Sequence, residues 1–162
     1  MKLIISIGNP GEKYKNNRHN AGYLVIDVLK KLRTKELKNL ILAKTDTYMN
    51  DSGSFVSKLI NHYSLDINHL YVVHDDLDLP LGTWKIQYAK GPKDHGGIND
   101  IEQKLGTKNF WRVRVGVDNR KPEVKVSGEE YVLQDFTKKE VVQVEQVIKK
   151  AVQELCKKLA TS

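Results

Sequence analysis

Residues 2–11 read KLIISIGNPG, and this stretch sets the pattern for the rest of the chain. Six mostly apolar residues, 2–7, are followed at once by Gly-Asn-Pro-Gly, residue types that favour turns. A short apolar run bounded by a turn signal is typical of a buried strand. We therefore expect residues 2–7 to form a buried strand whose carboxyl end leads into a turn.

Alternating helices and strands follow when the same criteria are applied along the chain. Apolar residues at helical spacing predict a helix over Asn20–Arg33 and a short one over 97–105. The same spacing predicts a helix over 55–63, with Asp51 or Ser52 as its N-cap. Apolar or alternating runs predict further strands over 40–43, 70–74, 83–88 and 110–117.

The clearest element is the last one. Thr137 and Glu140 have the spacing of a capping box, and apolar residues recur at helical spacing from Val141 to Leu159. With a hairpin expected after Pro80, the order of elements predicts an α/β fold, a three-layer sandwich with a mixed, mostly parallel central sheet. Because the 162 residues contain no repeat or linker-like stretch, we expect a single domain over 1–162.

Composition excludes several classes of protein. The chain is 40% hydrophobic and has one Cys, which excludes an intramolecular disulfide framework and a cysteine-rich zinc site and suits a reducing compartment. No apolar run approaches the roughly 20 residues that span a bilayer, and the first apolar run is too short for a signal peptide. We therefore expect a soluble, cytoplasmic protein with no membrane partner.

Positive charge is concentrated in the first third of the chain. The formal net charge is +7; residues 1–50 hold 10 Lys and Arg against 4 Asp and Glu, whereas the remainder holds 17 against 16. A local excess of this kind fits a polyanionic partner such as nucleic acid. Ordinary cytoplasmic proteins are also mildly basic, so the charge alone leaves both interpretations open.

Polar side chains follow three predicted strands, at the edge where α/β sheets place their working loops. Asn9 follows the first strand, Asn50 the second and Asp75 the third. His19 lies in a polar loop at the entrance of the first helix. Each has an ordinary alternative: a turn or a helix cap for the asparagines, a surface position for the histidine and a solvated turn for the aspartate.

Three carboxylates, Asp75, Asp76 and Asp78, lie within four residues of what we expect to be an acidic loop. Such a cluster chelates Mg²⁺ only when further oxygen ligands converge on it, whereas one aspartate is enough to orient a histidine. No His/Cys set has the spacing of a zinc site. The pattern therefore favours a carboxylate that acts on an imidazole over a metal centre.

Basic residues lie on two of the predicted strands. Arg112 and Arg114 share one face because side chains alternate along a strand, so Arg114 and Lys85 are placed to flank a phosphate. A solvated sheet edge is the alternative. Residues 90–97, KGPKDHGG, resemble a phosphate-approach loop that leads into a helix, although the Gly-Lys-Ser/Thr ending of a P-loop is missing.

Taken together, three motifs resemble those of bacterial-type peptidyl-tRNA hydrolases. They are GNPGxxYxxxRHNxG at residues 8–22, TYMNxSG at 47–53 and HDDLDLPxG at 74–82. The resemblance continues over 95–101, 110–116 and 132–140. It implies a single α/β domain that hydrolyses the ester joining a peptide to the terminal ribose of tRNA, and so recycles tRNA, with no cofactor and no metal.

The resemblance also implies roles for individual residues. His19 matches the catalytic base, and Asp75 matches the carboxylate that orients it. The positions that match substrate-binding residues are Asn9, Tyr14, Met49, Asn50 and His95, the last of them near the substrate entrance. Lys85 and Arg114 match positions that bind tRNA phosphates. The implied partner is peptidyl-tRNA, and we expect a monomer.

Three features depart from the pattern of this family. Gly96 stands where an asparagine is usual, residues 91–94 have fewer glycines and more charge, and residues 33–47 are shorter than usual. Because His19 and Asp75 are unchanged, we expect catalysis to persist with altered affinity. The alternative is a non-catalytic RNA-binding relative of the same fold, of the intron-splicing-factor type. A Mg²⁺-dependent phosphohydrolase built on the acidic cluster ranks third.

Overall fold

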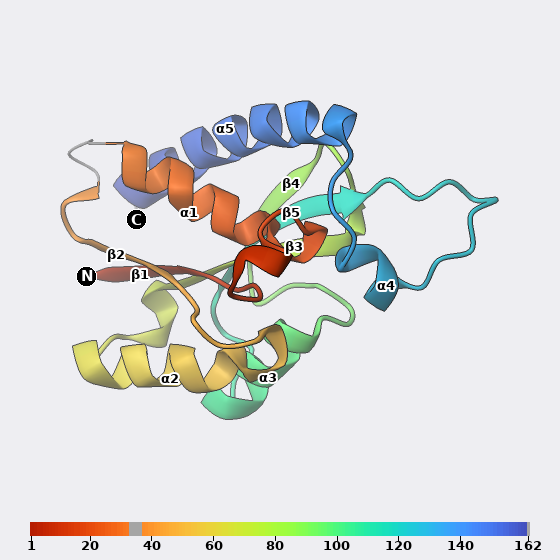
Figure 1. Cartoon of the computed structure of the whole chain (residues 1–162). Helices are drawn as coiled ribbons and strands as arrows, with labels where there is room; N and C mark the ends of the chain where they lie inside the picture. The colour runs from red at the N-terminus through yellow and green to blue at the C-terminus, as the bar shows by residue number, and fades with distance from the viewer. Residues whose placement is uncertain (33–36, 162) are drawn as a thin grey trace.

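A five-stranded sheet runs through the part of the chain that the computed structural model describes, residues 1–32 and 37–161 (Figure 1). Its strand order is β2-β1-β3-β5-β4. The strands are β1 (Lys2–Ser6), β2 (Leu40–Lys44), β3 (Leu70–Pro80), β4 (Trp84–Tyr88) and β5 (Trp111–Asp118). All neighbouring strands are parallel except β4, which is antiparallel to β5. The predicted mixed, mostly parallel sheet is therefore confirmed.

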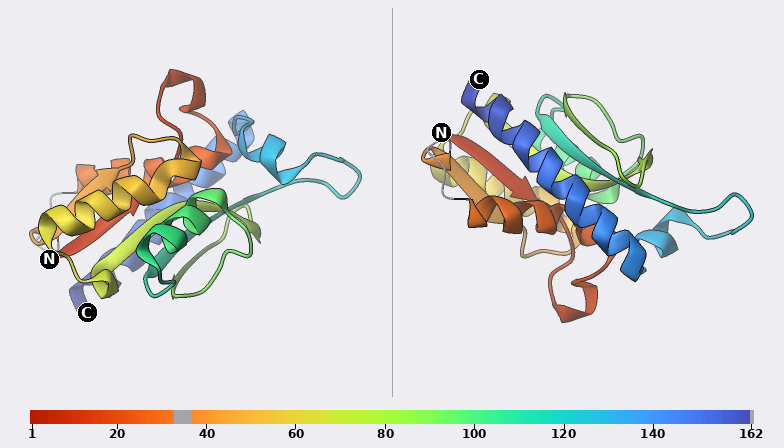
Figure 2. Two further views of the ribbon diagram at one scale, coloured as in Figure 1. Left: turned by 90° about the horizontal axis from the view of Figure 1, so that it is seen from below. Right: turned by 90° about the horizontal axis from the view of Figure 1, so that it is seen from above.

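Helices cover both faces of this sheet and make it the middle of three layers. Figures 1 and 2 show α1 (Ala21–Lys31) and α5 (Lys138–Thr161) on one face. On the other face lie α2 (Ser52–Tyr63) and α3 (Gly96–Leu105). The three-layer α/β sandwich expected from the sequence is the fold observed. Among the described residues, no helix combines the length and apolar character needed to cross a membrane.

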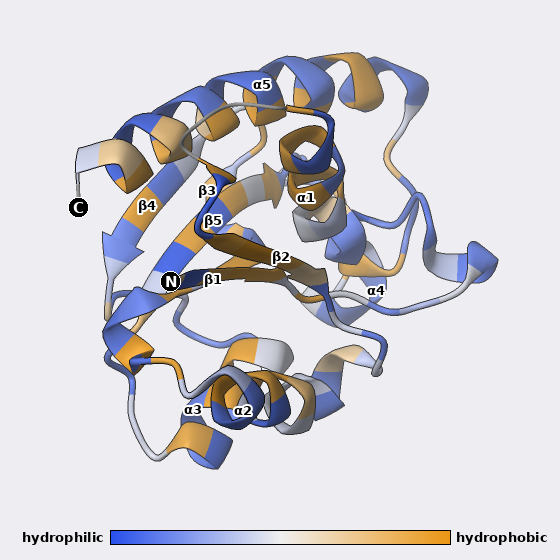
Figure 3. Cartoon of the chain, turned by 90° about the vertical axis from the view of Figure 1, so that its left-hand side faces the viewer, coloured by the Kyte–Doolittle hydropathy of each residue, from blue (hydrophilic) through white to orange (hydrophobic). Residues whose placement is uncertain are grey.

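Alternation along the central strands divides the apolar side chains between two cores. Ile4 and Tyr71 join the cluster under α1 and α5, whereas Leu3, Ile5 and Val72 join the cluster under α2 and α3. Successive strand residues point to opposite faces, so a stretch of strand that packs against helices on both sides, such as Leu3–Ile5 of β1, is apolar at every position. Figure 3 shows β1 and β2 as mostly hydrophobic, and it shows the hydrophobic side of α5 turned toward the sheet.

Two expectations about the middle of the chain are wrong. Residues 75–78 are not a loop, because β3 continues through them to Pro80. No hairpin joins β3 to β4, since β5 lies between them in the sheet. Both errors have one cause: β5 forms a parallel ladder with β3 as far as Asp76, and this long-range pairing holds an acidic segment in a strand.

The other element boundaries are close to the expected ones. The capping box of α5 forms, with Thr137 N donating to Glu140 Oε1 and Glu140 N donating to Thr137 Oγ1. The short helix α4 (Gly128–Val132) was not predicted. Arg33, where the first helix was expected to end, lies outside the described residues.

The end of β1 opens the space in which polar groups collect. β1 pairs with β3 only as far as Ser6 opposite Val73, and β3 then continues without β1 beside it. The first turn of α1 packs closely above this point, because a Cβ at Gly22 would lie 2.6 Å from the carbonyl oxygen of Val73. Glycine at this position therefore lets the residues just before α1 approach His74 and Asp75 of β3.

Candidate active site

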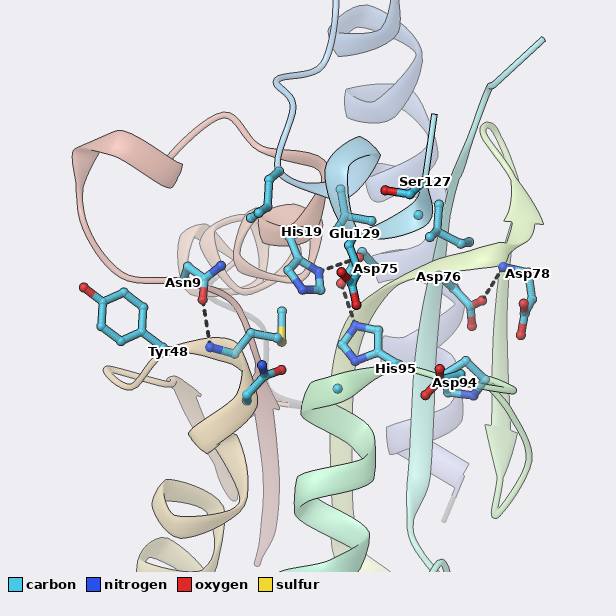
Figure 4. A pocket seen from close by; sticks show the side chains of 18 residues that line it. Asn9, His19, Tyr48, Asp75, Asp76, Asp78, Asp94, His95, Ser127 and Glu129 are labelled. Atoms are coloured by element: carbon cyan, nitrogen blue, oxygen red, sulfur yellow. Dashed lines mark hydrogen bonds and ion pairs between the residues drawn. The ribbon is translucent and has the colours of Figure 1, made fainter. Parts of the chain in front are cut away.

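A cavity of about 750 Å³ lies beyond the carboxyl ends of β1 and β2, beside the distal half of β3 (Figure 4). Its polar lining comes from five separate parts of the chain. These parts are the β1–α1 connection, the turn before α2, strand β3, the start of α3, and α4 with its flanking residues. This is the edge at which parallel α/β sheets bind ligands. Residues that line the cavity include Asn9, His19, Met49, Asn50, Asp75, His95 and Glu129.

His19 and Asp75, 56 residues apart, meet in this cavity. His19 lies in a 3₁₀ turn, Arg18–Asn20, directly before α1, and Asp75 lies in β3. Nδ1 of His19 is 2.8 Å from Oδ2 of Asp75. The carboxylate is 1% exposed and the imidazole 16% exposed, so only the imidazole is accessible from the cavity. The structure thus brings together the two residues that the sequence singled out.

Asp75 is also held from its other side. Nε2 of His95 lies 2.8 Å from Oδ1 of Asp75, and Figure 4 shows the two imidazoles on either side of the carboxylate. Nδ1 of His95 accepts a hydrogen bond from the Ile98 amide, as the N-cap of α3. Because a neutral imidazole carries one proton, Nε2 of His95 must be the atom that donates to Asp75. His95 is therefore a largely buried residue of the cavity lining and a partner of Asp75.

The pKa values of this cluster follow from its contacts. Burial alone raises the pKa of Asp75, but the two imidazoles overcome this effect and hold that pKa well below its usual value. Burial lowers the pKa of His19, whereas the charge of Asp75 and the hydrogen bond to it raise the pKa by more, so the result lies above 6.5. Asp75 is thus an anion that favours the protonated form of His19.

His74 forms the floor of the cluster, a position that the sequence did not reveal. Its ring packs edge-on against His95, with 5.2 Å between centroids. Burial, reinforced by His95, lowers the pKa of His74 to about 3, so the ring is neutral at ordinary pH. Its Nδ1 donates to the Asp75 carbonyl oxygen over 2.7 Å. A neutral side chain behind His95 adds no competing positive charge near Asp75.

Asn9 is held by three hydrogen bonds. Its main chain exchanges two of them with the side chain of Asn20, each 2.8 Å long. Its Oδ1 accepts from the Met49 amide over 2.7 Å. Since the oxygen is committed, the amide NH₂ of Asn9 is the group left for a substrate. Met49 itself is buried, and its main-chain N–H is already satisfied by Asn9.

Asn50 lies exposed in the 3₁₀ turn Met49–Asp51, across from the start of α3. Its amide oxygen occupies the space where a side chain at position 96 would begin, because a Cβ at Gly96 would overlap Asn50 Oδ1. Gly96, where the resemblance predicts an asparagine, thus makes room for Asn50. The start of α2 is capped from another helix. The Asp51 side chain, at the predicted N-cap position, accepts no hydrogen bond from the first turn of α2. Instead, Oδ2 of Asp100 in α3 accepts from the main-chain N–H of Gly53.

Two tyrosines extend the cavity outward. Tyr48 is 60% exposed and lines the cavity. Tyr14 packs edge-to-face against it, with 6.3 Å between ring centroids. Tyr14 therefore contacts a residue of the cavity lining, Tyr48, but does not line the cavity itself. The other predicted substrate-binding residues all line the cavity: Asn9, Met49, Asn50 and His95.

Lys85 and Arg114 are register partners on β4 and β5, so their side chains share a face of the sheet. Lys85 is exposed. Arg114 is 6% exposed, and its guanidinium donates to Asp76 Oδ2 over 2.6 Å and to Gln87 Oε1 over 2.7 Å. This arrangement does not favour the direct phosphate contact expected for Arg114, because its charge is already neutralised by Asp76.

The acidic cluster does not converge on a common point. Asp76 holds Arg114, and Asp78 Oδ2 accepts from the Lys93 amide. Within residues 1–32 and 37–161, the group that fits a metal best is His19, Asp75 and His95, whose ligand atoms lie within 4.8 Å of one another. Their 2.8 Å N···O contacts are hydrogen-bond distances, so both oxygens of Asp75 already accept from the two imidazoles.

Known proteins resemble this chain over nearly its whole length. The family described as Peptidyl-tRNA hydrolase matches residues 3–162. A peptidyl-tRNA hydrolase of Aquifex aeolicus is 39% identical, with coverage of 100% of this chain and 92% of that protein. One from Bacillus subtilis is 38% identical, with coverage of 94% and 88%. The crystal structure of peptidyl-tRNA hydrolase from Acinetobacter baumannii superposes with a TM-score of 0.77 at 25% identity, covering 98% of this chain and 92% of that one.

Proposed function

Since this chain belongs to the peptidyl-tRNA hydrolase family, we propose that it hydrolyses the ester between peptide and tRNA with His19 as general base and Asp75 as its orienting carboxylate. One observation carries the proposal: the 2.8 Å contact between His19 Nδ1 and Asp75 Oδ2 at the wall of the cavity. Peptidyl-tRNA is the substrate, and the cytoplasm, where tRNA is used, is the place of action.

The tautomer of His19 follows from this contact. Asp75 is ionised and only accepts, so Nδ1 of His19 carries the proton and Nε2 has a free lone pair. Nε2 takes a proton from a water molecule while the water oxygen attacks the ester carbonyl carbon. The imidazolium that forms is stabilised by Asp75. General-base assistance of this kind contributes about 10²–10⁴-fold, or roughly 3–5 kcal/mol of barrier.

The second half of the reaction returns the proton. The carbon–oxygen bond to the terminal ribose breaks, and Nε2–H of His19 gives its proton to the departing ribose oxygen. The products are a peptide with a free carboxylate and a tRNA with its terminal hydroxyl restored. Amide N–H groups of Asn9 and Asn50 are the proposed donors to the carbonyl oxygen while it carries negative charge.

Metal is not required by this chemistry, because the imidazole supplies the base and the amides supply the oxyanion donors. We therefore keep the expectation of a metal-independent and cofactor-independent enzyme as part of the proposal. The monomeric state likewise remains a prediction. The proposed binding surface for tRNA includes Lys85 and exposed lysines in the first third of the chain, such as Lys13 and Lys15.

The test is single-turnover cleavage of a peptidyl-tRNA in excess chelator. We expect the wild-type rate to be unaffected by chelator, His19→Ala to lose cleavage, and Asp75→Asn to reduce it strongly. The matched control is His69→Ala, which removes an exposed imidazole at the amino end of β3, away from the cavity.

Two results would overturn the proposal. Wild-type protein that binds tRNA but releases no peptide would support the non-catalytic RNA-binding alternative. Cleavage that disappears in chelator and returns with added Mg²⁺ would support a metal-dependent reaction instead.

A further inference from the structure

Arg18, next to His19 in the chain, is almost fully buried in a polar network that the proposed reaction does not use. It is 5% exposed, and its Nη2 lies 2.7 Å from Oε1 of Glu140 in α5. Its Nη1 donates to the carbonyl oxygen of Tyr131 in α4 over 3.3 Å. The guanidinium carbon also lies 4.0 Å from the centre of the Tyr131 ring. One side chain therefore contacts both α4 and α5.

Glu140 connects this arginine to further parts of the chain. Its Oε1 also accepts from the Thr137 amide, and its Oε2 accepts from Asn119 Nδ2. The main-chain N–H of Asn119 in turn donates to the hydroxyl of Tyr131 over 3.0 Å. Both carboxylate oxygens of Glu140 are thus paired, and both terminal nitrogens of Arg18 have partners, whereas its Nε has none among the described residues. Paired groups in a buried polar network hold one another in a single arrangement.

Main-chain contacts run parallel to the side-chain network. The Arg18 amide donates to the Gln134 carbonyl, and the Phe136 amide donates to the Asn16 carbonyl, each over 3.1 Å. Asn17 Nδ2 donates to Asp135 Oδ1 over 2.8 Å. The residues before His19 are therefore tied to the segment between α4 and α5.

That segment continues directly into one side of the cavity, here called the α4 wall, residues 127–133. Five of its residues line the cavity that His19 also lines, and Figure 4 shows Ser127 and Glu129 among them. His19 and the α4 wall thus face the same space while both are anchored through Arg18. A shift of about 1 Å between a catalytic base and its substrate lowers rates strongly.

We propose that Arg18 is a positioning residue that fixes His19 and the α4 wall relative to each other around the substrate. The inference rests on the proposed function for its effect on turnover. Its structural content, that Arg18 holds the His19 imidazole against Asp75, is testable without any substrate. Lysine cannot replace arginine here, because it lacks the planar fork that reaches Glu140 and Tyr131 together.

The experiment compares Arg18→Lys with Arg112→Lys. Arg112 is a chemically matched control: it is 1% exposed, pairs with Glu102 over 2.9 Å and lies 4.1 Å from the Phe110 ring centre. It does not line the cavity. Both variants keep every carboxylate around His19. In both, a buried guanidinium is replaced by an ammonium group, so we expect similar losses of thermal stability.

Two readouts separate positioning from support of the fold. The first is the pKa of His19, followed by NMR of the imidazole in the free protein. With Arg18→Lys the contact to Asp75 loosens and burial dominates, so this pKa falls toward or below its ordinary value. The second is the division between kcat and KM: kcat falls on the order of tenfold or more, and KM rises because the α4 wall is released. With Arg112→Lys neither readout changes.

Two results would refute the proposal. One is a His19 pKa, kcat and KM that are unchanged in Arg18→Lys while stability falls as in Arg112→Lys. The other is a change of equal size in the His19 pKa, kcat and KM of Arg18→Lys and Arg112→Lys. If Arg18→Lys does not fold, Glu140→Gln, which keeps the shape of the side chain, is measured in its place, with Glu102→Gln as control. A protein without hydrolase activity would refute the proposed function, whereas the NMR readout would still decide the role of Arg18.

Discussion

His95 and Asp75 are joined by a 2.8 Å hydrogen bond that runs from the N-cap of α3 to the middle of β3. It occupies the carboxylate oxygen that His19 does not use. Both oxygens of Asp75 are therefore committed, and the carboxylate cannot rotate without breaking one contact. Since general-base catalysis depends on the direction of the imidazole lone pair, the rigidity of Asp75 is part of the proposed catalytic machinery.

The first prediction concerns His95→Asn. Asparagine is a good N-cap, so α3 keeps its first-turn hydrogen bond, but the shorter amide loses the contact with Asp75. We expect kcat to fall about tenfold, and the melting temperature to fall as well, because one oxygen of the buried Asp75 loses its partner. Asn99→Ala, one turn further along α3, is the control. An unchanged kcat in His95→Asn would show that His95 only caps the helix.

The second prediction concerns pH. His19 must be unprotonated to act as a base, and Asp75 raises its pKa above 6.5. The single-turnover rate should therefore fall as the pH drops through a midpoint above 6.5. In Asp75→Asn only burial remains to shift the pKa of His19, so the midpoint moves to lower pH although the maximal rate is reduced. A midpoint that does not move in this variant would contradict the assignment of the base.

The third prediction concerns Gly96→Ala. The added methyl group would displace the amide of Asn50, an exposed side chain, so the expected cost in stability is small. If Asn50 contacts the substrate, kcat/KM falls on the order of tenfold. In the Asn50→Ala background the same change should have no further effect, because there is no amide left to displace. Equal losses in both backgrounds would mean that Gly96 acts independently of Asn50.

The fourth prediction separates Lys85 from Arg114. Lys85→Ala should reduce by about one the slope of log Kd for tRNA against log salt, since one phosphate contact is lost. Arg114→Ala should leave that slope unchanged and destabilise the fold by about 3–5 kcal/mol, because Asp76 becomes a buried unpaired charge. Salt titrations and denaturant unfolding measure the two effects. Lys58→Ala on α2, which does not line the cavity, is the control for tRNA binding.

A slope that falls in Arg114→Ala would show that this guanidinium reaches phosphate after all. A slope that is the same in Lys85→Ala and in Lys58→Ala would remove Lys85 from the proposed tRNA surface.

Much of the architecture could be predicted because its signals are local. The apolar run at residues 2–7, the capping box at Thr137 and the spacing of apolar residues in α1 and α5 depend on neighbours within a few positions. The path of β3 could not be predicted this way. Its acidic residues look like a turn, and only pairing with β5, some 40 residues away, makes them a strand.

The sequence by itself determined the layered α/β fold, and it singled out His19 and Asp75 as the proposed catalytic pair. Residue type, motif order and strand-end position carry that information. Only the tertiary structure decided that His95 donates a hydrogen bond to Asp75 and that Arg114 pairs with Asp76. It also decided that Arg18, next to His19, contacts both α4 and α5. The reason is physical: which polar groups satisfy one another depends on burial and on distances of about 3 Å between segments far apart in the chain.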